Sequence, residues 1–420
     1  MGTTKFIKVG AKLGNPKFGA TSTVCNTTFS SSWRQTWRIP SGVNTSFNVV
    51  DYGALGNGQT DDSQAFLKAW QQVCGATQGT PTLIVPRGKT FMLQPVMFMG
   101  PCKAAIVNFN LQGIITAPNT LESWKWGNSN KDSWITFSNI NGLVVNGGGQ
   151  IDGQGAPWWQ CKNCDRPTVL KFNDCQNLKL SRLAHINSPR NHISINLCNN
   201  ATISDLHIEA PKESPNTDGI DIASSSNLVI TTSTIQTGDD CIAINNGSSY
   251  INITSIVCGP GHGISIGSLG RNGAYETVEM VHVQNCTFNG SSNGARIKTW
   301  KGGSGYARNI TFENITIVGG NNPIIIDQQY DNPYYTTDDG IGTAVKVSDV
   351  TYRNVLGTTA WKDAIQLNCD PIGCNDIVLD NINITSTYYG QANQALSTCQ
   401  YAQGTCTSCN PHVSCLSGFL

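Results

Sequence analysis

Three aspartates occupy glycine-containing segments from which they could act together as acid and base. Asp218 precedes a glycine, and Asp239 and Asp240 follow one. Carboxylates that lie close together repel one another, which raises the pKa of at least one of them. Cleavage of a glycosidic bond needs such a mixed set, because a neutral carboxylic acid protonates the departing oxygen while an ionised one activates water or attacks the sugar. Taken singly, each segment also fits an ordinary Asx or glycine turn.

The spacing of these residues predicts that they meet. Asp218 and Asp240 are 22 residues apart, as are Asp240 and His262, and an isoleucine lies two residues after each of the three. If 22 residues make one coil of a solenoid, the three side chains stack as a column on one face, with Asp239 beside them. Taken alone, His262 could equally be a solvated histidine in a tight bend.

Two basic residues follow about one coil further along. Arg296 and Lys298 occupy alternate positions of a short strand, so their side chains point the same way. Arginine binds carboxylates through a fork of two hydrogen bonds, and lysine adds a compact positive charge. The pair predicts a ligand that itself carries carboxylates, although a solvated strand face would look the same.

Internal repeats predict the scaffold that must position these residues. A strand with alternating apolar residues, followed by a second short strand, recurs along most of the chain. Eight copies begin at Asn177, Asn200, Asn227, Tyr250, Met280, Asn309, Asp349 and Asp376. Their starts are 23 to 40 residues apart, too irregular for a propeller but expected of solenoid coils with inserted loops. We therefore expect an all-β, single-domain, right-handed parallel β-helix; leucine-rich repeats would need shorter and more regular units.

The predicted β-helix covers residues 47–398 and needs a cap at each end, because an open coil exposes its core and its strand edges. At the N-terminal end, Asp61 is expected to be the N-cap of a helix, with Gln64 three residues further on. The apolar face of this helix would consist of Ala65, Phe66, Ala69, Trp70 and Val73. Residues 1–46 are expected to be a poorly ordered extension, and the cysteine-rich residues 399–420 the C-terminal tail.

Composition and charge limit the partners. The 27 basic and 27 acidic residues leave no general field that would attract nucleic acid or an anionic membrane. No apolar stretch reaches the roughly 18 residues of a transmembrane helix. The chain has neither a glycine-rich phosphate loop nor a Gly-x-Ser-x-Gly nucleophile elbow. We therefore expect a monomer that uses no cofactor and binds neither nucleic acid nor membrane.

Sixteen cysteines indicate a secreted, extracellular protein with disulfides. Cys369 and Cys374, and the four cysteines from Cys399 to Cys415, have the close spacing of small disulfide loops. Ten Asn-x-Ser/Thr sequons are compatible with glycosylation, although an Asn- and Thr-rich chain produces some by chance. Residues 1–46 contain no apolar segment of the signal-peptide kind. The prediction of secretion therefore rests on the cysteines.

No metal site is expected. Two Cys-x-x-Cys pairs, at Cys161 and Cys164 and at Cys406 and Cys409, lie too far apart in sequence to favour a shared zinc ion. Clustered aspartates could instead hold calcium, which prefers oxygen ligands. Calcium-dependent elimination is therefore a rival to hydrolysis.

Taken together, these segments resemble the plant polygalacturonases of glycoside hydrolase family 28. The resemblance runs from about Phe47 to the last cysteines. Four segments carry it, in order along the chain: residues 214–219 (SPNTDG), 237–241 (TGDDC), 258–263 (CGPGHG) and 296–298 (RIK). Two further segments, 51–54 (DYGA) and 322–328 (NPIIIDQ), are also similar to the family.

The resemblance implies hydrolysis of the α-1,4-D-galacturonosyl linkages of pectin, with homogalacturonan as the substrate and with inversion at the anomeric carbon. It implies that Asp239 is the general acid and that Asp218 and Asp240 hold and activate water. It further implies that His262 supports the acid, that Asn216 lines the site, that Arg296 and Lys298 bind galacturonate carboxylates, and that Tyr330 borders the site beyond the scissile bond. The carboxylates of family members lie closer than the roughly 6.5–9.5 Å usual for inverting glycosidases.

Several alternatives remain open at the level of sequence. Endo cleavage is slightly favoured over exo cleavage, and rhamnogalacturonan or xylogalacturonan could replace homogalacturonan. Residues 331–342 and those after 388 have little to match in the family and could decide how the substrate enters. A calcium-dependent pectate lyase and a wall-binding β-helix without turnover are the rival functions.

Overall fold

The computed structural model describes residues 45–127, 131–330, 343–388 and 394–416. All of these lie in one structural unit, Asn44–Leu420. The predicted N-terminal extension, residues 1–46, falls outside the described residues except for residues 45 and 46. The segment 331–342 lies wholly outside them.

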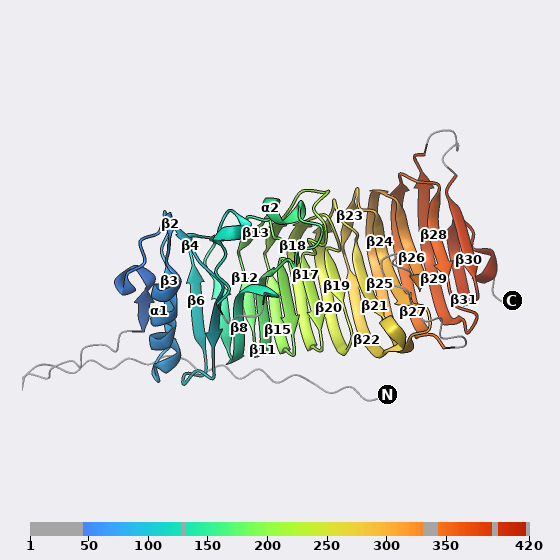
Figure 1. Ribbon diagram of the computed structural model, residues 1–420. Coiled ribbons are helices and arrows are strands. Elements are labelled where there is room, and N and C mark those ends of the chain that lie inside the picture. Colours follow the sequence, from blue (N-terminus) through green and yellow to red (C-terminus); the bar gives the residue numbers. More distant parts are fainter. Residues whose placement is uncertain (1–44, 128–130, 331–342, 389–393, 417–420) are drawn as a thin grey trace, which may run out of the picture. The chain divides into compact units, whose positions relative to one another are not determined.

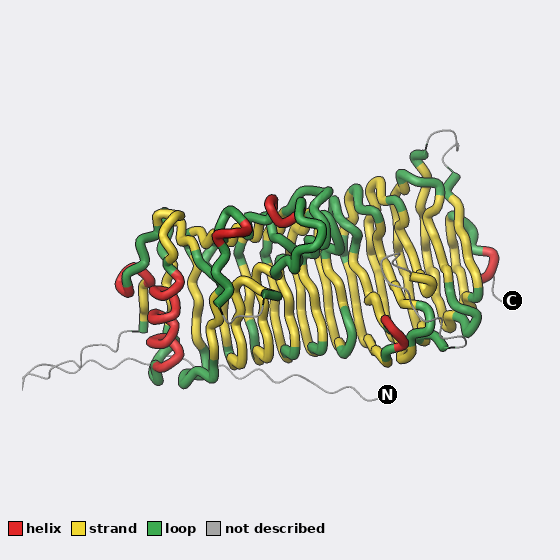
Figure 2. The backbone as a smooth tube through the Cα atoms, in the orientation of Figure 1, coloured by secondary structure: helices red, strands yellow, loops and turns green. Residues whose placement is uncertain are grey.

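Parallel strands wind into a β-helix with three faces, which Figures 1 and 2 show from one side. The site face contains β5 (Val96–Met99), β8 (Ser133–Asn141), β11 (Thr168–Gln176), β14 (Ile193–Asn196), β17 (Ile220–Ala223), β19 (Ile242–Ile244), β21 (Ile264–Leu269), β24 (Asn293–Trp300), β26 (Asn322–Tyr330), β28 (Asp363–Asn368) and β30 (Leu396–Gln400). Neighbouring strands of this face pair in parallel throughout. The expected all-β, right-handed parallel β-helix is confirmed.

The other two faces complete each coil. The second face contains β1 (Ser46–Asn48), β3 (Thr82–Val85), β6 (Val107–Leu111), β9 (Leu143–Asn146), β12 (Lys179–Ser181), β15 (Asn199–Ser204), β18 (Ser226–Gln236), β20 (Ser248–Cys258), β22 (Tyr275–Gln284), β25 (Ser304–Gly320), β27 (Lys346–Thr359), β29 (Cys374–Ser386) and β31 (Ala402–Asn410). The third face contains β2 (Asn57–Asp61), β4 (Thr90–Met92), β7 (Ile114–Thr116), β10 (Gln150–Asp152), β13 (Ala184–Ile186), β16 (His207–Glu209) and β23 (Thr287–Asn289). The long strands β18, β20, β25, β27 and β29 continue round the corner from the second face into the third.

The register between coils is the one that the 22-residue spacing predicts. Ile220 pairs with Ile242, and Ile242 pairs with Ile264. The residues two positions earlier, which include the three candidate site residues with this spacing, therefore stand at equivalent places in successive coils.

The eight repeat starts turn out to be corner residues. All eight have φ between 53° and 59°, the left-handed region, and each lies within or just before a strand of the second face. Asparagine tolerates this conformation better than most residues. The Asn200 side chain also donates to Asn177 at 2.6 Å, and Asn177 donates to Asn141 at 2.6 Å. The repeated Asn therefore marks a turn whose side chains bond from coil to coil.

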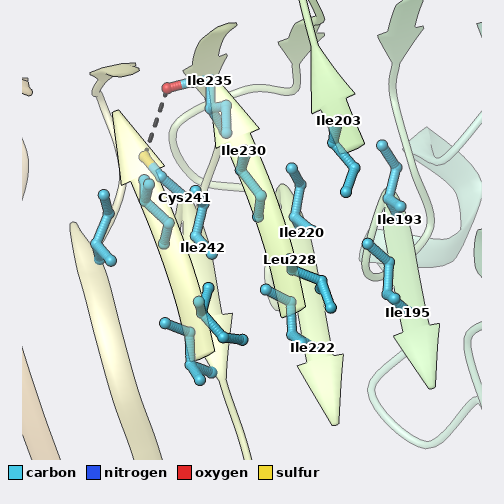
Figure 3. Packing of buried hydrophobic residues seen from close by; sticks show 14 of the residues in the cluster. Ile193, Ile195, Ile203, Ile220, Ile222, Leu228, Ile230, Ile235, Cys241 and Ile242 are labelled. Carbon is cyan, nitrogen blue, oxygen red and sulfur yellow. Dashed lines mark hydrogen bonds between the residues drawn. The ribbon is translucent and has the colours of Figure 1, made fainter. Parts of the chain in front are cut away.

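Stacked isoleucines fill the interior behind the site face (Figure 3). Ile193, Ile220 and Ile242 form one column of paired positions, and Ile195 and Ile222 belong to the next column. All five are fully buried. Because strand residues alternate between faces, burial of these isoleucines turns the intervening residues outward, onto the surface that carries the candidate site.

Helix α1 (Ser63–Gly75) covers the N-terminal coil, and its predicted apolar face is buried. The predicted N-cap was wrong by one residue, because Asp62 occupies the cap position. Asp62 directs its carboxylate to the backbone N–H groups of Leu55 and Gly56, at 2.7 and 3.0 Å. Asp61 instead accepts from the N–H of Ser63 at 3.0 Å. The remaining helices are short: η1 (Val49–Tyr52), η2 (Leu121–Ser123), α2 (Ala156–Trp159), η3 (Arg271–Gly273) and η4 (Ser414–Leu416).

Disulfides close small loops, as the cysteine spacing predicts. The pairs in the described residues are Cys74–Cys102, Cys161–Cys164, Cys241–Cys258, Cys369–Cys374, Cys399–Cys415 and Cys406–Cys409. Both Cys-x-x-Cys pairs are thus bonded internally. In the cysteine-rich tail, β30 and β31 pair with β28 and β29, so strand pairing continues past residue 398 to Asn410. None of the described helices is both long enough and apolar enough to cross a membrane.

Replacement of a core isoleucine tests the stacked interior. Ile244→Ala leaves a cavity in a fully buried column, so we expect the free energy of unfolding to fall by about 2–5 kcal/mol. Val229→Ala, at an exposed position of the second face, is the matched control and should change it by less than about 0.5 kcal/mol. Urea unfolding followed by circular dichroism measures both variants. Equal losses would contradict the packing described here.

Candidate active site

Three turns at the N-terminal edge of the site face bring the acidic residues together. Asp218 lies in the turn before β17, Asp239 and Asp240 in the turn before β19, and His262 in the turn before β21. These turns pack so tightly that a Cβ atom on Gly238 would lie 2.0 Å from the carbonyl oxygen of Ser214. The glycines in the site segments therefore allow consecutive coils to approach closely enough for their carboxylates to interact.

Asp239 accepts hydrogen bonds on both carboxylate oxygens. Oδ1 lies 2.8 Å from Nδ1 of His262 and accepts from the N–H of Asp240 at 2.9 Å. Oδ2 accepts from the amide of Asn216 at 3.2 Å. Burial raises the pKa of Asp239, but the hydrogen bond and charge of His262, with the charge of Lys298, lower it by more. The net pKa lies below the usual aspartate range, so Asp239 is held as a carboxylate in this state.

Asp240 is buried and paired with cations. Lys298 Nζ donates to its Oδ2 at 2.7 Å, Ser265 donates to its Oδ1 at 2.7 Å, and Nη1 of Arg296 lies 3.6 Å from Oδ1. Burial lowers the pKa of Lys298, but the charge and hydrogen bond of Asp240 raise it by more. The net pKa of Lys298 therefore lies above its usual value. This buried pair fixes a negative charge within the acidic cluster.

Asp218 has the opposite electrostatic character. Its burial and the neighbouring charges of Asp221, Asp239 and Asp240 raise its pKa well above the usual value. Asp221 faces the same surface from β17, and burial raises its pKa to about 7. The cluster therefore combines a carboxyl group of lowered pKa, Asp239, with two of raised pKa, Asp218 and Asp221, as expected for acids that repel one another.

An aromatic ring borders the basic side of the site. The ring centroid of Tyr330 lies 5.6 Å from Nζ of Lys298 and 5.6 Å from Cζ of Arg296. Its ring also packs edge-on against Trp300, with centroids 5.2 Å apart. Nε of Arg296 is buried and has no hydrogen-bond partner in the described part of the chain. The guanidinium thus retains a donor beyond its contact with Asp240.

The structure gathers all eight predicted site residues. The register places Asp218, Asp240 and His262 at equivalent coil positions, as expected. The imidazole nevertheless bonds to Asp239, because Asp240 turns its carboxylate toward Lys298 and Ser265. The three residues thus share one coil position, as the spacing predicts, and the imidazole is bonded to Asp239, which lies beside that column.

Three neighbouring residues did not emerge from sequence reasoning. Asp221 and Ser265 could have been found, because the register places them in the outward-facing column that also contains Arg296. Arg166 donates to Oδ1 of Asn216 at 2.6 Å from a loop 50 residues earlier in the sequence. No spacing rule connects that loop to the site.

The carboxylates offer little to a metal ion. Ligand atoms of Asp239, Asp240 and His262 all lie within 4.8 Å of one another, so geometry alone would permit a cation. Calcium, however, takes six to eight oxygen ligands. Here one carboxylate is already neutralised by Lys298 and a third ligand is an imidazole nitrogen. These residues do not fit a calcium site.

Two surface hollows differ in their chemistry. One of about 300 Å³ lies beside His262 and is also lined by Lys212, Ser292 and Asn321. A larger one of about 670 Å³ lies on the second face, around Tyr250 and Met280. The smaller hollow borders the acidic cluster through His262 and Gly238, whereas the larger one is lined by none of the predicted site residues.

A parallel β-helix that sets carboxyl groups of raised and lowered pKa beside cations on one surface has the components of a glycoside-cleaving enzyme. The comparisons with known proteins identify the family. A family model described as "Glycosyl hydrolases family 28" matches residues 74–409, and the chain belongs to this family of glycosidases.

Relatives and solved structures agree with this assignment. The chain is 50% identical to a probable polygalacturonase of Arabidopsis thaliana over 377 residues, 89% of this chain and 81% of the relative. It is 43% identical to a polygalacturonase of Cryptomeria japonica over 353 residues, 81% of this chain and 67% of the relative.

Among solved structures, endo-xylogalacturonan hydrolase from Aspergillus tubingensis matches with a TM-score of 0.71 and 25% identity, covering 89% of this chain and 99% of that one. A hyperthermoactive exopolygalacturonase from Thermotoga maritima matches with a TM-score of 0.67 and 22% identity, covering 81% and 88%. The latter likeness shows the fold alone.

The raised pKa of Asp221 predicts a pH-dependent stability. Because its folded pKa is about 7 and its ordinary value 3.8, ionisation costs stability, and the cost grows as pH rises from about 4 to about 7. Asp221→Asn should therefore unfold at higher urea than the parent at about pH 8, and this advantage should vanish near pH 4. Exposed Asp205→Asn is the control and should show no such trend. An advantage independent of pH would contradict the prediction.

Proposed function

We propose that the chain hydrolyses α-1,4-D-galacturonosyl linkages of de-esterified pectin by an inverting, general acid–base mechanism. The hydrogen bond between Asp239 and His262, set beside the cation-paired Asp240, carries this proposal. It provides a proton donor and a fixed negative charge on one surface, which are the two components of glycoside hydrolysis. The names of the plant relatives, all polygalacturonases, support galacturonan as the substrate.

Asp239 is the proposed general acid, although its carboxylate is ionised in the free protein. The hydrogen bond between Asp239 and His262 resolves this difficulty, because the two side chains can share one proton. An ionised carboxylate beside a protonated imidazole and a neutral acid beside a neutral imidazole differ only in the position of that proton. Closure of the site by a sugar excludes water and disfavours the separated charges. The proton then moves to Asp239 Oδ1 and from that carboxyl group to the departing glycosidic oxygen.

Asp218 and Asp240 are the proposed pair that holds and activates water. Lys298 and Ser265 donate hydrogen bonds to Asp240 and fix the position of its carboxyl group, so it can orient the water. As the water attacks the anomeric carbon, the water gives one proton to a carboxylate of the Asp218–Asp240 pair. Attack from the face opposite the leaving group inverts the anomeric centre.

Arg296, Lys298 and Tyr330 are the proposed binding residues on the C-terminal side. Arginine and lysine next to one another suit the carboxylate of a galacturonate, and the tyrosine ring supplies an apolar surface for the sugar. Asn216 bonds to Asp239 and is proposed to line the opposite edge of the scissile bond.

Calcium-dependent elimination is the main alternative. It would require the acidic cluster to bind calcium against the positive charges of Lys298 and Arg296. Ultraviolet-absorbing unsaturated products that disappear on chelation would establish it. Non-catalytic binding would instead give measurable affinity for polygalacturonate with no release of reducing ends.

The mode of cleavage and the setting of the protein extend the proposal. We favour endo over exo cleavage slightly, and sizing the products of a short digestion distinguishes mixed oligomers from released monomer. Six disulfides in the described residues support an extracellular location. We propose that the protein acts there as a monomer on cell-wall pectin.

Asp239→Asn tests the acid directly. An amide cannot donate the proton, so the rate of reducing-end release from polygalacturonate should fall by about 10²–10⁴-fold. Circular dichroism should be unchanged, because Asn keeps the shape of the side chain. Asp205→Asn is the control for the loss of one carboxylate. Retained activity in Asp239→Asn would reject the assigned role.

His262→Ala tests the shared proton. Without the imidazole, the proton must reside on the carboxyl group alone, and a carboxylic acid ordinarily loses its proton at lower pH than an imidazolium does. The alkaline limb of the kcat/KM profile against pH should therefore move to lower pH. An unchanged limb with only a lower maximum would mean that His262 acts structurally.

A further inference from the structure

Two arginines, Arg166 and Arg190, lie on the N-terminal side of the acidic cluster, opposite the Arg296–Lys298 pair, and their charges interact. Arg166 lies in the loop that follows the Cys161–Cys164 disulfide and precedes β11. Arg190 lies in the turn before β14. Neither belongs to the segments that carry the family resemblance.

Arg166 connects the turn that contains Arg190 to the turn that contains Asn216. Its Nη1 donates to the carbonyl oxygen of Pro189 at 3.4 Å and to that of Pro215, and its Nη2 donates to Oδ1 of Asn216 at 2.6 Å. Asn216 in turn donates to Asp239. A continuous chain of hydrogen bonds therefore links Arg166 to the proposed acid.

In the described part of the chain neither arginine forms an ion pair, although Asp221 lies near enough to Arg190, and Asp239 to Arg166, for their charges to interact. Among the residues that the structure describes, no carboxylate lies within 4.0 Å of either guanidinium, and Arg190 is exposed. Burial and the positive charge of Arg190 lower the pKa of Arg166. Crowding of like charges costs free energy that a bound anion would remove. By contrast, Lys298 and Arg296 already share Asp240.

The two basic groups stand too far apart to bind one carboxylate. The coils that follow the turn of Arg190 begin with β14, β17, β19, β21 and β24, and Arg296 lies in the last of these. Four coil steps of roughly 4.8 Å place them roughly 19 Å apart along the helix axis. A chain lying over the acids would therefore present different sugars to the two groups.

We propose that Arg190, supported by Arg166, binds the carboxylate of a second galacturonate on the N-terminal side of the scissile bond. This inference rests on the proposed function, since it requires an acidic glycan. Arg190 is the specificity-determining residue, because its guanidinium is exposed and no described carboxylate lies within 4.0 Å of it. Arg166 is a positioning residue that also adds charge. The site therefore selects for acidic sugars on both sides of the cleaved bond.

Steady-state kinetics of Arg190→Gln test the proposal. On unesterified polygalacturonate, kcat/KM should fall about 10- to 100-fold, the loss expected for a hydrogen-bonded charge pair. The loss should appear in KM, with kcat nearly unchanged, because the contact is remote from the reacting atoms. On highly methyl-esterified pectin the loss should be much smaller, since an ester carries no charge. Arg190→Lys should recover part of the activity on polygalacturonate.

Arg182→Gln is the matched control. This exposed arginine lies between β12 and β13, at the corner of the second and third faces, and its loss removes the same charge away from the site face. If Arg190→Gln matches Arg182→Gln on polygalacturonate, the proposal is overturned. An equal loss on both substrates would also overturn it, because a structural defect does not distinguish acid from ester.

A binding measurement separates this proposal from the proposed function. Trigalacturonate is titrated by calorimetry into Asp239→Asn and into Asp239→Asn/Arg190→Gln. At least about 10-fold weaker binding by the double variant supports the subsite even if the parent releases no reducing ends. Equal affinity, or binding by neither variant, overturns the subsite.

Discussion

The backbone register between successive coils is the constraint on which the site depends. Parallel pairing of β17, β19 and β21 fixes the turns that precede these strands at equivalent positions. Each turn contributes a polar group, and the close approach of coils brings these groups into contact despite their mutual repulsion. The buried isoleucine columns stabilise the register, because a shift by one residue would expose them. The same packing that holds the fold together therefore forces carboxylates into proximity.

Carboxylates brought together without compensation would repel one another and destabilise the fold. Nearby basic residues reduce this repulsion. Lys298 and Arg296 compensate Asp240 from a strand one coil beyond Ser265. The pKa of Asp218 is raised, whereas His262 lowers that of Asp239. The site thus gives its carboxyl groups different pKa values. Arg166 and Arg190 add positive charge on the N-terminal side, where we propose that an acidic glycan binds.

Sequence predicted the parts of this arrangement that follow from periodicity. The 22-residue spacing gave the coil length, and the repeated Asn marked the corners, although its left-handed conformation appears only in the structure. Periodicity could not predict that His262 would bond to Asp239, since that depends on which way adjacent carboxylates turn. Nor could it place Arg166, whose contact with Asn216 is made by an irregular loop. The predicted N-cap was wrong by one residue because Asp61 and Asp62 are both suitable cap residues. The sequence does not show that the N–H of Leu55 donates to Asp62.

The configuration of the first product tests the central claim most directly. Ligand atoms of Asp239 and Asp240 lie within 4.8 Å, nearer to the roughly 5–5.5 Å typical of retaining glycosidases than to the inverting range. Our account nevertheless predicts inversion, because Asp240 is paired with Lys298 and orients water. Proton NMR during the first turnovers of an oligogalacturonate should show the β-anomer at the new reducing end before mutarotation. Initial release of the α-anomer, or of an unsaturated sugar, would contradict the account.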